Sequence, residues 1–137
     1  MDKTSIDLAN EEKEEKKIIE RFENAFISLH DAFAIEQPPE ENTIKKYLNE
    51  LKNACNELLQ IKKRQKKKMP ETFQPDISAC NLELTRIIRL IESIEQKQEY
   101  RIESIDKILE EITKYKKLIE NLINKVLKPA ARKATTA

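Results

Sequence analysis

The apolar residues between Leu84 and Val126 recur with an alternating spacing of three and four residues that never slips. Thirteen positions follow this spacing, and eleven of them are Leu, Ile, Val or Tyr. A stripe of this kind lies along one face of an α-helix. The two exceptions, Gln98 and Arg101, lie in the stretch IEQKQEYRIE, which has no Gly, Pro, Asn, Asp or Ser to signal a turn. The pattern therefore favours a single helix that runs through this stretch.

Prolines divide the rest of the chain into two further helical segments. Pro38 ends the first, and the segment PETFQPD separates the second from the third. We predict helices over about 7–37, 42–69 and 76–128. The chain contains no Gly, and 37% of its residues are charged, which is typical of long amphipathic helices. The predicted fold class is therefore all-α.

The predicted architecture is an antiparallel helical bundle of two shorter helices and one long C-terminal helix. It forms a single domain over residues 1–128, and residues 129–137 are expected to be a disordered basic tail. The alternative is a closed up-down-up-down four-helix bundle with a bend near Gln98. In that arrangement Gln98 and Arg101 lie at a solvated bend between two helices of similar length.

A continuous C-terminal helix would extend beyond its own bundle, since it would reach roughly 75 Å and the first two helices only about 40 to 50 Å. Exposing the apolar stripe of its second half would forgo on the order of 20 kcal/mol of burial. We therefore expect partner helices to cover this stripe, in a homo- or hetero-oligomer. The predicted partner-binding residues are Ile102, Ile105, Ile108, Leu109, Ile112, Tyr115, Ile119, Leu122 and Val126. A second apolar surface for partners is predicted on the first helix, at Phe22, Phe26 and Phe33.

The function predicted from this pattern is a non-catalytic helical protein–protein interaction module, either an adaptor or a subunit of a coiled-coil assembly. An alternative is a chaperone-like helical bundle that wraps a segment of a client protein. Both functions depend on apolar association between helices, so the sequence does not separate them.

The densest charged feature is the run KKRQKKK, and two interpretations of it stay open. Such a cluster can bind nucleic acid, another anion or a nuclear import receptor, which gives a second alternative function, a small nucleic-acid- or anion-binding protein. Cations in the last turns of a helix also stabilise its carbonyl end without any partner. The cations of the run are Lys62, Lys63, Arg64, Lys66, Lys67 and Lys68.

The first two predicted helices carry opposite charge. Residues 1–40 contain 11 acidic and 5 basic side chains, whereas residues 41–69 contain 3 acidic and 9 basic ones. We therefore expect these helices to attract each other when they pack antiparallel, although solvated pairs contribute little to stability.

Nothing in the sequence predicts an enzyme. His30 is the only histidine, and Cys55 and Cys80 are too far apart along the predicted hairpin for a disulfide. We therefore predict no catalytic, cofactor-binding or metal-binding residues, and interpret the cysteines as buried apolar side chains in a reducing compartment. No signal peptide and no membrane-spanning run is recognised. The expected location is intracellular, cytoplasmic or nuclear.

Overall fold

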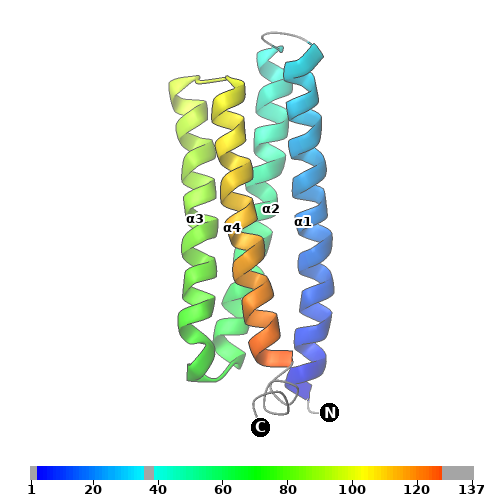
Figure 1. Ribbon diagram of the computed structural model, residues 1–137, viewed down its shortest axis with the longest axis vertical. Coiled ribbons are helices and arrows are strands. Elements are labelled where there is room, and N and C mark those ends of the chain that lie inside the picture. The colour runs from blue at the N-terminus through cyan, green and yellow to red at the C-terminus, as the bar shows by residue number, and fades with distance from the viewer. Residues whose placement is uncertain (1–2, 36–38, 128–137) are drawn as a thin grey trace.

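The computed structural model describes residues 3–35 and 39–127, which form four long helices packed side by side (Figure 1). They are α1 (Lys3–Ile35), α2 (Glu41–Lys68), α3 (Gln74–Lys97) and α4 (Ile102–Leu127), with a short 3₁₀ helix, η1 (Glu71–Phe73), before α3. The all-α fold class is therefore confirmed, but the predicted number of helices is wrong. The predicted basic tail, residues 129–137, lies outside the described residues.

Neighbouring helices run in opposite directions, as the colour progression in Figure 1 shows. Ion pairs between α1 and α2 follow the same order, because Glu15 pairs with Lys62 whereas Arg21, further along α1, pairs with the earlier residue Glu57. α4 returns beside α1, where its Lys116 pairs with a glutamate of α1. The start of α1 and the end of α4 therefore lie at the same end of the bundle.

One apolar core runs along the bundle and receives side chains from all four helices. Phe22, Phe26 and Phe33, which we predicted as a second apolar surface for partners, are instead buried in this core. Cys55 and Cys80 are buried there as free thiols, which confirms their predicted place in the interior. A smaller cluster closes the end near η1 and consists of Met69, Ile77 and Leu122.

The chain turns between α3 and α4, which corrects the prediction of a single helix over 76–128. Gln98 adopts the left-handed conformation, with φ 51° and ψ 37°. Its backbone N–H donates to the Glu95 carbonyl, and the N–H of Glu99 donates to the Ile94 carbonyl. These two bonds form a Schellman motif, a helix end in which Gly usually takes the left-handed position.

Burial of the α4 stripe explains why the chain turns within a sequence of good helix formers. A left-handed residue other than Gly costs about 1 to 2 kcal/mol, whereas burying one large apolar side chain contributes about 1.5 to 3 kcal/mol. The turn lets α4 bury six such side chains against the other helices, so burial outweighs the backbone cost. Tyr100 and Ile102 also pack against the core from the turn. The six side chains are those of Ile105, Ile108, Ile112, Tyr115, Ile119 and Leu122.

The connection between α2 and α3 is held by Gln74, the first residue of α3. Its side-chain Nε2 donates to the carbonyl oxygens of Lys66 and Met69, at 2.9 and 3.1 Å. Carbonyl groups in the last turn of a helix have no helical partner, so the side chain of Gln74 satisfies them. At the same end of the bundle, Asp76 of α3 pairs with Lys125 of α4 at 3.0 Å.

Candidate partner-binding surfaces

The predicted partner-binding stripe of α4 lies mostly inside the bundle. Six of its nine residues are the buried side chains of α4 named above. Ile102 is half-buried and packs on the core, Leu109 is 43% exposed, and the side chain of Val126 lies outside the described part. The chain's own helices cover this stripe. Burial of the stripe therefore does not require a second chain.

A groove of about 580 Å³ lies between α1 and α4, which meet less closely than the other neighbouring helices. Ile19, Ile119 and Ile123 form the apolar part of its lining. The first two are buried core residues and Ile123 is half-buried, so the floor of the groove is the edge of the core. α1 and α4 are the first and last helices of the bundle, so no short turn draws them together.

Charged side chains line both rims of this α1/α4 groove. Lys16 pairs with Glu12 along α1, and Lys116 of α4 pairs with Glu23 of α1, both at 3.2 Å. The second pair bridges the two helices. Glu120, on the α4 rim, forms no ion pair within residues 3–35 and 39–127. The groove therefore combines an apolar floor with one uncompensated acidic group.

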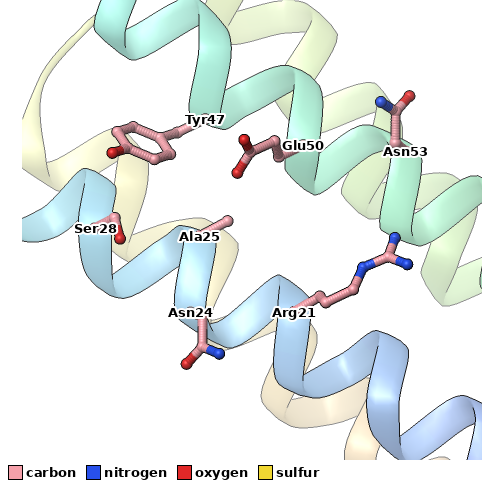
Figure 2. Close-up of a pocket in the computed structure, with 7 residues that line it drawn as sticks. All are labelled: Arg21, Asn24, Ala25, Ser28, Tyr47, Glu50 and Asn53. Carbon is pink, nitrogen blue, oxygen red and sulfur yellow. The ribbon is translucent and has the colours of Figure 1, made fainter.

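A second groove, of about 420 Å³, lies between α1 and α2 (Figure 2). It forms where α1 carries the small side chains of Ala25 and Ser28, which leave space beside the ring of Tyr47. Glu50 of α2 extends over this space toward Tyr47, and Arg21 lies at the opposite end from the ring (Figure 2). The lining is rich in polar groups, so it suits a small polar ligand better than an apolar helix.

Five of the six cations of the predicted anion-binding run are exposed, and the sixth, Lys62, is buried. Lys62 is only 1% exposed, and Arg64 pairs with Glu11 and Glu14 of α1, at 3.6 and 3.2 Å. The expected attraction between the acidic first helix and the basic second helix thus takes the form of specific ion pairs. The exposed cations of the run are Lys63, Arg64, Lys66, Lys67 and Lys68.

Lys62 belongs to a buried polar cluster that sequence reasoning missed. Its Nζ donates to Oε1 of Glu15 at 2.7 Å and to Oε1 of Gln65 at 2.9 Å. Burial raises the pKa of Glu15, and the neighbouring Lys62 charge opposes that rise. A signal was present, because Lys62 follows Leu58 by four residues and so lies in register with the apolar stripe of α2.

A second buried acid, Glu83, lies at the α3/α4 interface and is only 3% exposed. Its carboxyl group is within hydrogen-bonding distance of Glu111 on α4. Burial first, and then the contact with Glu111, raises the pKa of Glu83 to about 7. The same hydrogen bond lowers the pKa of Glu111. Sequence reasoning passed over both residues, because acidic side chains are common on solvated helix faces.

The thiols of Cys55 and Cys80 and the hydroxyl of Tyr115 lie in buried side chains. Burial raises the pKa of the Cys55 thiol to about 12 and that of the Cys80 thiol to about 11, so both are protonated at neutral pH. Burial also raises the pKa of Tyr115, whose hydroxyl has no hydrogen-bond partner among the described residues. His30 is exposed and lies 3.7 Å from Asp106. In the described part of the chain, none of these residues forms a nucleophile–base pair.

The described residues contain no group of three or more His, Cys, Asp or Glu side chains placed to hold a metal ion. None of their helices is both long enough and apolar enough to cross a membrane. Comparison of the chain with protein-family models, with curated proteins and with solved structures finds no match in any of the three.

Proposed function

We propose that this chain is a non-catalytic interaction module that binds one amphipathic helix of a partner protein in the α1/α4 groove. The observation that carries the proposal is the groove itself. It is larger than the α1/α2 groove, and its floor of Ile19, Ile119 and Ile123 is apolar. An apolar groove between helices with charged rims is a common way for proteins to bind a helix.

The shape and the charge of the groove both favour a helical partner. Two antiparallel helices that stand slightly apart present parallel ridges, and a third helix can pack between them. Partner side chains spaced by three and four residues would then contact the three isoleucines of the floor. Because Glu120 lacks a counter-ion in the described chain, a Lys or Arg beside the apolar stripe of the partner is favoured.

Selection from a phage-displayed library of amphipathic helical peptides on the full chain tests this function. We expect binders with an apolar stripe and at least one flanking Lys or Arg. A single helix buries less area than a standard interface, so dissociation constants of about micromolar size are expected. Ile123→Glu should weaken binding at least about tenfold, because it places a carboxylate on the apolar floor beside Glu120.

The matched control is Leu82→Glu, which changes an exposed leucine of α3 and should leave peptide binding unaltered. In the unaltered chain, bound peptide should shift the NMR signals of the Ile19 and Ile119 methyl groups. The proposal is contradicted if the library yields no helical binder. It is also contradicted if Ile123→Glu leaves binding unchanged and the methyl shifts lie elsewhere.

The two alternatives expected from the sequence now differ in their support. Two of the six cations of the basic run, Lys62 and Arg64, form ion pairs with glutamates of α1. Binding of an anion to the run is therefore not proposed. A chaperone-like bundle would use the same α1/α4 groove, with a helix of the client as the partner. The peptide selection therefore tests the binding step of that function as well.

A further inference from the structure

The α3/α4 interface contains a pair of carboxyl groups that the proposed function does not use. Glu83 of α3 is buried, and its carboxyl group lies against that of Glu111 on α4. A groove of about 460 Å³ opens beside the pair. Its lining residues are Arg86, Leu90, Lys107, Glu110, Glu111 and Lys114.

Two carboxyl groups in contact attract each other when they share a proton and repel each other when both are ionised. When one is protonated, its O–H donates to the other and the bond ties α3 to α4. When both are ionised, they repel each other, and Oε1 of Glu83 is buried without a donor. The loss of one proton therefore converts an attraction between the two helices into a repulsion.

Neighbouring cations moderate this repulsion without removing it. Arg86 of α3 lies 3.6 Å from Glu83, and Lys114 of α4 lies 3.1 Å from Glu111. Both cations are well exposed, so solvent weakens their effect. Lys107 and Glu110 of α4 also line the groove, and no charged group of α2 in the described chain acts on the Glu83 pKa.

We propose that Glu83 and Glu111 form a pH-sensitive contact, in which one shared proton holds α3 against α4 below neutral pH and its loss loosens the two helices above neutral pH. The contact lies beyond the partner-binding function and does not depend on it. It uses residues of α4 that do not line the α1/α4 groove.

The sign of the effect follows from the raised pKa of Glu83. The ordinary value is 4.5 and the value in the fold is about 7, so between these pH values the folded chain holds a proton that the unfolded chain has released. The contribution of the pair to stability is therefore full in acid and is lost as the pH rises through about 7. The raised pKa of Glu15 acts with the same sign, and the lowered pKa of Glu111 matters only in more acidic solution.

Glu83→Gln tests the contact, because the amide keeps the shape of the side chain and donates a hydrogen bond to Glu111 at every pH. We expect the Tm of the parent chain to fall by about 5 °C between about pH 6 and about pH 8.5, and that of E83Q by less than half as much. Glu92→Gln, an exposed acid of α3, is the matched control and should follow the parent. All three proteins carry His30→Gln, so that titration of the histidine does not contribute.

Carbon-13 NMR of the carboxyl groups gives a second measurement that needs no substitution. The Glu83 signal should titrate with a midpoint near pH 7, and amide exchange at the α3/α4 turn should accelerate beyond its ordinary pH dependence over the same range. A Glu83 midpoint near pH 4.5 overturns the proposal. Equal pH dependence of Tm in E83Q and its parent also overturns it.

Discussion

At the scale of single residues, the bundle contains buried ionisable side chains whose neighbours lie on other helices. Lys62 of α2 pairs with Glu15 of α1, and Glu83 of α3 lies beside Glu111 of α4. A buried charge is costly unless a partner compensates it, so Lys62 and Glu15 depend on each other. Two carboxyl groups attract each other only when they share a proton. Substitution of one member therefore acts on the packing of two helices and not only on one contact.

Lys62→Met should lower the free energy of unfolding by about 3 to 5 kcal/mol, because Glu15 then lies in the interior without its cation. The double substitution with Glu15→Leu should recover most of this loss, since both positions become apolar. The loss should also be smaller in acid, where Glu15, whose pKa is raised, takes up a proton. Urea unfolding at two pH values measures each effect.

Lys63→Met is the control for this comparison, because Lys63 is the exposed neighbour in the same helix. Its effect should stay within about 0.5 kcal/mol. If Lys62→Met proves equally mild, the ammonium group of Lys62 is solvated and the buried cluster does not form in solution.

At the scale of the helices, the prolines located α2 closely, α1 begins at Lys3 and not near residue 7, and apolar spacing missed the turn between α3 and α4. The predicted range 42–69 differs from α2 (Glu41–Lys68) by one residue at each end, since prolines flank that helix. The turn at Gln98 was missed because the stripes of α3 and α4 keep the same three-four phase on both sides of it. Gln also occupies a position where Gly would have signalled a helix end, so only burial of α4 against the other helices decides the turn.

Gln98→Gly should raise the free energy of unfolding by about 1 kcal/mol, because Gly adopts the left-handed conformation without the steric cost of a Cβ atom. Gln60→Gly makes the same change in the middle of α2, at an exposed position, and should lower it by about 1 kcal/mol. Thermal and urea unfolding of both variants measure the difference. Equal destabilisation by the two would mean that α3 and α4 form one continuous helix.

At the scale of the whole molecule, the sequence identified the right apolar residues but not what covers them. An apolar stripe such as that of α4 indicates only that some other surface must bury it. The same residues can be buried inside a closed bundle or in an interface between two chains. The α1/α4 groove could not be predicted, because it depends on the distance at which the first and last helices pack. The contact between Glu83 and Glu111 could not be predicted either, because the two residues are distant in the sequence.

Ile112→Glu and Leu109→Glu separate these two uses of the α4 stripe. In the closed bundle Ile112 is 1% exposed, so a glutamate there should lower the free energy of unfolding by at least about 4 kcal/mol. Leu109 is exposed, and the same change there should cost less than about 1 kcal/mol. If a second chain covered the stripe instead, both changes would reduce association and leave each chain folded. Urea unfolding combined with light scattering distinguishes the cases, because a folded Ile112→Glu variant of reduced mass is incompatible with burial of Ile112 inside its own bundle.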